Sequence, residues 1–351
     1  MKNIGIMSMQ RITNYGSYLI AVAMKNTFEK LGHHVEFVDF KIEPCVKDSC
    51  PDNYLDDLSE RDREFIKKTD EFKKVFLDEY LKELGINERN ERPALDTLVI
   101  GSDEVFNCLQ ENPNVGYSLE LFGKDAKANR VISYAASCGS TTYDELVKYG
   151  KVEEISSLLK EFDAISIRDN NSKEFIEKLT GTTPETSLDP VLLYNFENDV
   201  IDNVDISDYI IVYGYNLRFT EQENSVIKKF AQKHNKKIVC LGMYQTCCDI
   251  FIPAHPLEIL PYFAKADFVI TDTFHGSIFS IKGKTPFATI IRKSNQEKLS
   301  DLLNRFELSD RRLYDINDLE AFYSKPIDFT RSYELIDIQR EKALKYLNEN
   351  L

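Results

Sequence analysis

Short apolar runs alternate with longer amphipathic segments along most of this chain, and this alternation limits the folds open to it. Near the N-terminus, Ile4 and Ile6 lie in a β-like run that a polar turn over 10–16 follows. Residues 20, 24, 28 and 31 are apolar and share one helical face, and a second β-like run covers 35–40. A β–α–β unit of this kind implies two parallel strands joined by a right-handed crossover.

The same rhythm returns further along, so we predict two lobes of one class. Strands are predicted at 97–100, 131–134, 164–167, 209–213, 237–241, 268–271 and 287–291. Between them, the stretch that follows 188–190 (LDP) and runs through Asp208 is acidic and loop-like, which is typical of a linker. We therefore expect an α/β protein with two doubly wound Rossmann-like lobes, at 1–195 and 205–330. A C-terminal helix over 331–351 can pack back on the first lobe.

Residues from about 45 to 92 interrupt this rhythm with a segment dense in Lys, Glu and Asp. Its apolar periodicity is thin and centres on Phe65, Phe72, Phe76 and Leu81. We predict a charged helical insertion in the N-terminal lobe. Two interpretations stay open, namely ordinary surface helices and a lid or acceptor-recognition element.

The charge balance excludes several classes of partner. Lys and Arg number 44 against 58 Asp and Glu, so the net charge is −14. Nucleic acids and anionic membranes need a basic surface, which this composition disfavours. A small anionic ligand would therefore need a few cations gathered in one place. The seven cysteines form no CxxC pair, and no run approaches the length of a membrane span, so we expect reduced thiols, no metal and a cytoplasmic location.

The clearest chemical signal follows the predicted strand 268–271. Asp272 and Thr273 form a polar turn, His275 comes next, and Gly276-Ser277 opens a helix. Ligands of open α/β sheets bind at the carboxyl ends of strands, and the N–H groups of a helix start favour anions there. His275 can give or take a proton near neutral pH. The alternative is a structural histidine that holds the turn through Asp272.

Two arginines also follow predicted strands. Arg168 ends the strand 164–167 and Arg292 ends the strand 287–291, where a guanidinium can bind a carboxylate or phosphate through two hydrogen bonds. A salt bridge from Arg168 to Asp169 or a nearby Glu is the competing interpretation. The remaining strand-end turns match no GxGxxG or GxSxG pattern, so dinucleotide binding and serine hydrolysis are disfavoured.

Several of these turns, taken in order, resemble segments of the polysaccharide pyruvyl transferase family. The similar segments cover roughly residues 3–310 and are 14–16 (NYG), 101–107 (GSDEVFN), 133–139 (SYAASCG), 166–169 (SIRD) with 188–190 (LDP), and 271–276 (TDTFHG). The sequence departs from the family at Thr273, where many members have Arg, and at Ile20, where many have Gln. Thr273 leaves the site poorer in positive charge than the family pattern.

The resemblance implies a fold like that of two-lobed GT-B glycosyltransferases and a transferase without a cofactor. It implies phosphoenolpyruvate as the donor, a sugar of a surface polysaccharide or its lipid-linked precursor as the acceptor, and a pyruvyl ketal as the product. His275 and Arg168 then fall on catalytic and donor-binding positions. The predicted substrate-binding residues are Asn14, Gly16, Ser102, Asp103, Ser137, Asp272, Thr273, Gly276, Ser277 and Arg292.

Two other functions stay open at this point. One is a glycosyltransferase of the same shape that uses a nucleotide sugar, and the other is a non-catalytic relative that binds sugars or phosphate. A homo-oligomer and a peripheral position at the inner face of the membrane are compatible with all three.

Overall fold

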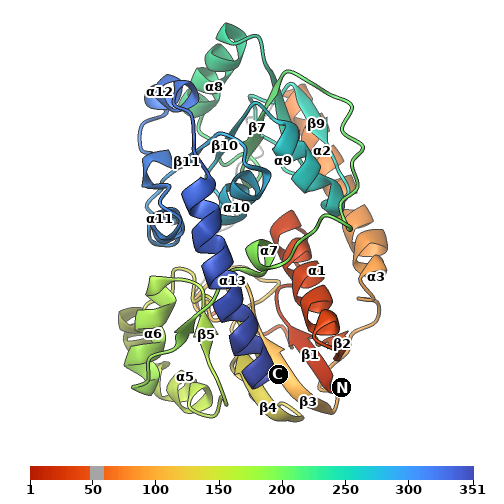
Figure 1. Cartoon of the computed structure of the whole chain (residues 1–351), viewed down its shortest axis with the longest axis vertical. Helices are drawn as coiled ribbons and strands as arrows, with labels where there is room; N and C mark the ends of the chain where they lie inside the picture. Colours follow the sequence, from red (N-terminus) through yellow and green to blue (C-terminus); the bar gives the residue numbers. More distant parts are fainter. Residues whose placement is uncertain (48–58) are drawn as a thin grey trace. The chain divides into compact units, whose positions relative to one another are not determined.

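The computed structural model describes residues 1–47 and 59–351, which form two compact units. The first unit holds 1–47, Leu81–Asn195 and Ile336–Leu351, and the second holds 59–80 and Phe196–Leu335. Each unit is built on a parallel sheet with helical connections (Figure 1), which confirms the predicted α/β class.

The first unit contains a four-stranded sheet in the order β2-β1-β3-β4. Single bridges from Ile132 to Ala164 and from Ala136 to Ile167 lead on to β5, which pairs with β6. Its strands are β1 (Asn3–Met7), β2 (His34–Phe37), β3 (Leu95–Ile100), β4 (Ala128–Ser133), β5 (Ser166–Ile167) and β6 (Glu185–Thr186). Its helices are α1 (Tyr15–Lys30), α3 (Leu81–Glu83), the 3-10 turn Leu119–Phe122, α4 (Tyr143–Lys148), α5 (Val152–Leu159), α6 (Asn170–Thr180) and α7 (Pro190–Leu193).

The second unit contains a six-stranded parallel sheet in the order β12-β11-β10-β7-β8-β9. Every residue of the central strands β7 and β10 is buried, as expected for parallel strands covered on both faces. The strands are β7 (Tyr209–Tyr213), β8 (Lys237–Leu241), β9 (Ile250–Ile252), β10 (Phe268–Thr271), β11 (Phe287–Ile290) and β12 (Arg312–Leu313). The helices are α2 (Glu60–Val75), the π-helical turn Phe76–Tyr80, α8 (Glu221–Lys233), α9 (Ile259–Lys265), α10 (Phe274–Gly283), α11 (Gln296–Arg305) and α12 (Leu319–Ser324), with 3-10 turns at Pro256–Glu258, Ser309–Arg311 and Ile316–Asp318.

The strand orders place a topological switch point in each sheet. In the first sheet the chain runs from β1 to β2 on one side and later adds β3 on the other side of β1. In the second sheet β7 has β8 on one side and the later strand β10 on the other. The crevices at the carboxyl ends of β1/β3 and of β7/β10 are therefore where a ligand is expected in each unit.

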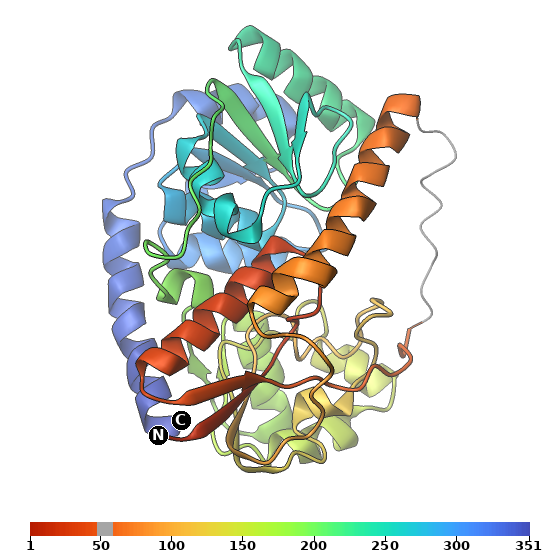
Figure 2. The ribbon, with the colours of Figure 1, turned by 90° about the vertical axis from the view of Figure 1, so that its right-hand side faces the viewer.

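The C-terminal helix α13 (Thr330–Asn350) ends on the first unit, as expected. Tyr346 donates to the carbonyl of Ser133 at 2.9 Å, and Lys2 and Thr97 donate to the carbonyl of Leu351 at 2.6 and 3.1 Å. Both views accordingly show the two chain termini side by side (Figures 1 and 2). These contacts join the last residues of the chain to β1, β3 and β4.

The predicted insertion does form helices, but its placement in the N-terminal lobe is wrong for α2, the orange helix of Figure 2, which belongs to the second unit. The ring of Phe65 stacks on Tyr244 at 4.7 Å between centroids and also contacts Phe251. Tyr244 donates to Asp62 at 2.7 Å. Periodicity shows that a helix has an apolar face, but it does not show which core receives that face. Residues 48–58 of the predicted insertion lie outside the described residues.

Helix starts follow the sequence closely. Thr220 and Glu223 form the predicted capping box at α8, and Asn14 caps α1 by accepting from the backbone N–H of Ser17 at 2.8 Å. Among the described residues, no helix is both long enough and apolar enough to cross a membrane.

The attachment of α2 should weaken in acid. Burial works to raise the pKa of Asp62, but hydrogen bonds from Ser59 and Tyr244 lower it below its ordinary value. A carboxyl whose pKa is depressed by folding stabilises the fold above its unfolded pKa of about 3.9, and that stabilisation is lost as the pH falls through the folded pKa. Asp62→Asn should therefore reduce the free energy of unfolding by about 1 kcal/mol at pH 7 and by less towards pH 3.

Urea unfolding followed between pH 3 and pH 7 measures this difference. Asp70→Asn is the matched control, because Asp70 lies on the same helix and its only ion pair among the described residues is with the partly exposed Lys73. A difference between Asp62→Asn and the native protein that stays constant with pH would contradict the assignment.

Candidate functional site

Hydrogen bonds of Ser102 link the ends of three strands at the switch point of the first unit. Its carbonyl accepts from Ser8 at 3.0 Å, and its hydroxyl donates to the carbonyl of Ala135 at 2.7 Å. Gly101 before it has φ +129°, and a Cβ there would lie 2.3 Å from the carbonyl oxygen of Tyr134. The predicted residue Ser102 thus joins the ends of β1, β3 and β4, and its buried hydroxyl is already occupied.

The predicted residues of α1 meet Asp103 at the same edge. Asn14 caps the helix, Gly16 is buried in its first turn, and Ser17 donates to Asp103 Oδ2 at 3.0 Å. Asp103 itself has φ +77°, a left-handed conformation that costs energy in a residue with a side chain. The structure therefore brings Asn14, Gly16, Ser102 and Asp103 together, as expected from their places after β1 and β3.

Arg168 joins Asp103 to a second carboxylate in the buried part of this edge. Only 4% of Arg168 is exposed, and its guanidinium lies 3.3 Å from Asp103 and 3.2 Å from Asp189. Burial works to lower the pKa of Arg168, but the carboxylates of Asp103 and Asp189 outweigh it and raise the pKa above its ordinary value. One cation is thus shared by two anions, and the predicted binding of a substrate anion by Arg168 would have to compete with both.

Ser137 is also engaged within the fold. Its hydroxyl donates to Asp169 Oδ2 at 2.6 Å, and Ser172 donates to the other oxygen of Asp169 through its N–H and its hydroxyl. Asp169 caps α6 in this way. The salt-bridge interpretation of Arg168 names Asp169 or a nearby Glu as the partner, whereas the ion pairs go to Asp103 and Asp189.

In the second unit, Thr273 caps α10 and its neighbours pack closely. Thr273 Oγ1 accepts from the N–H of Gly276 at 2.9 Å, and the Thr273 carbonyl accepts from the N–H of Ser277 at 3.2 Å. A Cβ at Gly276 would lie 2.1 Å from Thr271 Oγ1. The N–H groups of Gly276 and Ser277, which were predicted to bind an anion, are therefore already hydrogen-bonded.

Asp272 lies at the carboxyl end of β10 and gathers two arginines around it. Arg292 Nε donates to Asp272 Oδ2 at 2.6 Å, and Arg218 Nε lies 2.8 Å from the same oxygen. Arg292 also donates to both oxygens of Glu223 at 3.0 and 3.1 Å. Burial works to lower the pKa of Arg292, but Glu223 and Asp272 raise it above its ordinary value. Arg292 is thus bound to two carboxylates, as Arg168 is in the first unit.

Sequence reasoning missed Arg218 and, beyond its capping role, Glu223. Arg218 lies in the loop after β7, and the strand order that makes β7 the neighbour of β10 is not visible in the sequence. Glu223 serves both the capping box of α8 and the ion pair with Arg292.

His275 lies half-buried in the first turn of α10. Its ring centroid is 5.6 Å from that of Phe274 and 5.9 Å from that of Phe279. The capping oxygen of the turn comes from Thr273, and Asp272 is bound by Arg218 and Arg292. The turn before α10 is therefore held by Thr273, Arg218 and Arg292. The alternative interpretation of His275 was that it holds this turn through Asp272. Arg168 belongs to the first unit and His275 to the second.

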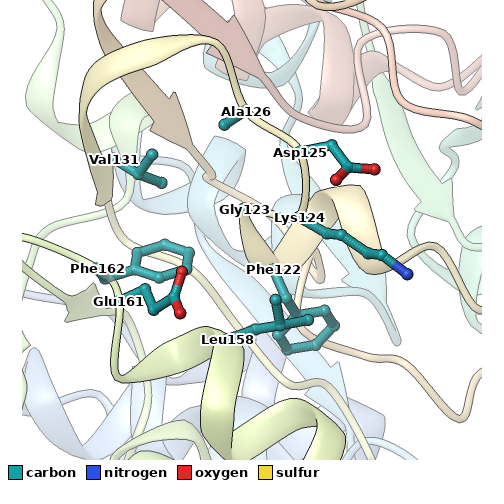
Figure 3. A pocket seen from close by; sticks show the side chains of 9 residues that line it. All are labelled: Phe122, Gly123, Lys124, Asp125, Ala126, Val131, Leu158, Glu161 and Phe162. Atoms are coloured by element: carbon teal, nitrogen blue, oxygen red, sulfur yellow. The ribbon is translucent and has the colours of Figure 1, made fainter.

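The pocket of Figure 3 lies elsewhere in the first unit, between the turn that precedes β4 and the end of α5. Its volume is about 340 Å³, and Lys124 and Asp125 project away from Phe162 there (Figure 3). The lining residues are Phe122, Gly123, Lys124, Asp125, Ala126, Val131, Leu158, Glu161 and Phe162. It lies at the amino end of β4, and no predicted site residue lines it.

The cysteines of the described residues are free thiols and belong to no group that could hold a metal ion. Six are free thiols, namely Cys45, Cys108, Cys138, Cys240, Cys247 and Cys248, while Cys50 lies outside the described residues. Burial raises the pKa of Cys108 and of Cys247 to about 12, so these thiols stay protonated at neutral pH. No group of three His, Cys, Asp or Glu side chains could hold a metal ion among residues 1–47 and 59–351.

Comparisons with known proteins support the family and the fold. A sequence model of the polysaccharide pyruvyl transferase family matches residues 14–294. No curated protein matches the chain in sequence.

Among solved structures, S. aureus MnaA with UDP is 11% identical with a TM-score of 0.52, and the alignment covers 99% of this chain and 97% of that one. The UDP-GlcNAc 2-epimerase of Neisseria meningitidis, bound to UDP-GlcNAc, is 11% identical with a TM-score of 0.52 over 100% of both chains. The glycotransferase of kitacinnamycin is 10% identical with a TM-score of 0.50 over 100% and 99%. At these identities the likeness shows the fold alone, and it confirms the expected GT-B-like class.

Removal of the Arg168 side chain should destabilise the protein strongly. Arg168→Ala leaves the carboxylates of Asp103 and Asp189 without their shared cation, and breaking a buried ion pair in this way costs about 3–5 kcal/mol. Urea unfolding measures the loss. Arg130→Ala is the matched control, because Arg130 is a partly exposed arginine of the same unit whose ion pair with Asp163 spans 3.9 Å and should contribute about 0–1 kcal/mol. Equal losses in the two variants would contradict a structural role for Arg168.

Proposed function

Because the chain belongs to the polysaccharide pyruvyl transferase family and is a transferase, we propose that it moves a pyruvyl group from phosphoenolpyruvate to a sugar of a surface polysaccharide or its precursor. The observation that carries the proposal is the family match over 14–294, because this range contains the predicted residues at the switch points of both units. Phosphoenolpyruvate is the proposed donor substrate, and no cofactor is proposed.

The proposed reaction joins two hydroxyls of one sugar to the same carbon of the donor. Protonation of the methylene carbon makes it a methyl group, and the first hydroxyl adds to the neighbouring carbon and loses its proton. Phosphate then leaves with its bonding electron pair, which produces an oxocarbenium-like centre. The second hydroxyl adds to that centre and loses its proton, so a ketal and inorganic phosphate are the products. The chemistry needs a proton donor and acceptor and a site for the donor's anionic groups.

His275 is the proposed general acid and base. It lies in the first turn of α10, directly beyond the end of β10, which borders the switch point of the second unit. The dipole of α10 favours negative charge near its N-terminal end, although Thr273 accepts from the N–H groups of Gly276 and Ser277 there.

Arg168 is proposed to act through Asp103 as a positioning residue. Its ion pairs with Asp103 and Asp189, together with the hydrogen bond from Ser17, hold the carboxylate of Asp103 in place. The backbone of Asp103 is left-handed. Asp103 then presents a carboxylate of defined geometry at the carboxyl ends of β1 and β3, where a sugar hydroxyl can donate to it.

Replacement of His275 tests the proposed chemistry. His275→Ala should lower kcat by about 10²–10⁴-fold, because the contribution of general acid–base catalysis is of that size. Phosphate release from phosphoenolpyruvate in the presence of acceptor sugars measures kcat, and the thermal midpoint checks the fold. His234→Ala is the control, since His234 lies in the same unit at the end of α8 and pairs with Glu320. Unchanged turnover in His275→Ala would make His275 structural.

A nucleotide sugar is the alternative donor. UDP or UDP-GlcNAc is bound in two of the similar solved structures, although that likeness concerns the fold alone. Thermal shifts with phosphoenolpyruvate and with a panel of nucleotide sugars separate the two donors, because a ligand stabilises the protein by RT ln(1+[L]/Kd). A shift with nucleotide sugars and none with phosphoenolpyruvate would overturn pyruvyl transfer.

The proposed setting is the cytoplasmic face of the membrane, where a lipid-linked acceptor sugar would be accessible. We also propose that the chain forms a homo-oligomer.

A further inference from the structure

The loop between β7 and α8 places Arg218 at the switch point of the second unit. Gly214 begins this loop, and a Cβ there would lie 2.9 Å from Asp272 Oδ1 and 2.6 Å from the ring of Phe219. The loop backbone therefore passes close to the buried carboxylate of Asp272. Because β7 and β10 are neighbours, Arg218 reaches the same crevice as Asp272 and the start of α10.

Hydrogen bonds to the neighbouring loop after β8 hold the Arg218 loop in place. Tyr244 donates its N–H to Asn216 Oδ1 at 2.7 Å, and its carbonyl accepts from the N–H of Leu217 at 2.9 Å. Gln245 donates to the carbonyl of Tyr215 at 2.5 Å. Leu217 has φ +53°, a conformation that costs energy in leucine and persists only where its surroundings impose it. The backbone of the residue next to it, Arg218, is thus set by the fold.

The two arginines around Asp272 differ in how far their hydrogen-bonding capacity is used. Arg292 donates through Nε, Nη1 and Nη2 to the carboxylates of Asp272 and Glu223. Arg218 lies 2.8 Å from Asp272 through Nε and donates to Ser294 through Nη2 at 3.2 Å, and its Nη1 has no hydrogen-bond partner within residues 1–47 and 59–351. Its side chain is 28% exposed against 20% for Arg292.

The negative charge around Asp272 is divided unequally between the two arginines. Both guanidiniums approach the same oxygen of Asp272, and Glu223 binds Arg292 through both of its oxygens. Arg218 therefore shares one carboxylate with a second cation. Its guanidinium also lies 5.4 Å from the ring centroid of Tyr215, which is 53% exposed, so the aromatic ring supports the cation at the protein surface.

We propose that Arg218 binds an oxyanion of the substrate, the phosphate or the carboxylate of the donor, at the carboxyl ends of β7 and β10. Asp272 positions the guanidinium through Nε, and the Nη1 group faces the ligand. Arg292 is a positioning residue that holds Asp272 and is neutralised by Glu223. The identity of the donor in this proposal rests on the proposed function, whereas the binding of an oxyanion by Arg218 does not.

The dissociation constant of phosphoenolpyruvate, measured by calorimetry on the full chain, tests the proposal. Arg218→Ala should raise Kd about 10–100-fold, because hydrogen bonds from a charged group to an anion are lost. Arg218→Lys should give an intermediate Kd, since lysine keeps the charge but not the planar fork of donors. Arg331→Ala is the control and should leave Kd unchanged, because Arg331 is an exposed arginine of the same unit, 54% exposed, that pairs with Glu307 and Glu334.

Inorganic phosphate and pyruvate, used as separate probes, identify the group that is bound. Weaker phosphate binding in Arg218→Ala assigns the phosphate to Arg218, and weaker pyruvate binding assigns the carboxylate. Phosphoenolpyruvate binding that is equal in Arg218→Ala and the native protein would overturn this inference and leave the proposed function standing.

The same measurements show whether the proposed donor is wrong while the role of Arg218 stands. If the native protein binds UDP or phosphate but not phosphoenolpyruvate, and Arg218→Ala loses that binding, the proposed donor is wrong and the role of Arg218 stands. If the native protein binds none of these anions, both proposals fail. The melting temperature of each variant shows that it is folded.

Discussion

Parallel strand pairing is the constraint on which the site depends, because it makes all strands of a sheet end at one edge. The hydrogen bonds between β1 and β3 and between β7 and β10 bring turns together that are far apart in the sequence. Ser17, in the first turn of α1, thereby contacts Asp103, and Arg218 contacts Asp272. The predicted residues can form a site only because this edge brings them together in each unit. The order of the strands decides which turns share a crevice.

An acidic chain can bind an anionic ligand only where cations gather locally. They gather at the strand ends here, but the arginines that were expected to bind the ligand are paired with carboxylates. Arg168 and Arg292 are each bound by two carboxylates. An arginine with this environment fixes the geometry of the carboxylates around it and has little capacity left for a ligand. The free capacity lies on Arg218, which has a single carboxylate partner among the described residues.

Local features were predictable because they depend on neighbours in the chain. The capping box of Thr220 and Glu223, the strand 268–271 and a helix opening at Gly276-Ser277 were predicted from spacing and side-chain type. The structure has all three, but the helix begins two residues earlier, at Phe274, because Thr273 caps it. The partners of Arg168 were not predictable, since Asp103 and Asp189 are 65 and 21 residues away. The same holds for α2, whose Phe65 packs on Tyr244 in the second unit.

By itself, the sequence determined the α/β class, the family and the residue types at the strand ends, because periodicity and short motifs are local properties of a chain. Only the tertiary structure decided which strand lies beside which, and therefore which carboxylate neutralises which arginine. The physical reason is that ion pairs and hydrogen bonds depend on distances of about 3 Å in space, which separation along the chain does not specify. Arg168, named from its position after a strand, is thus a buried support, while Arg218, which no motif marks, has the donors left to bind an anion.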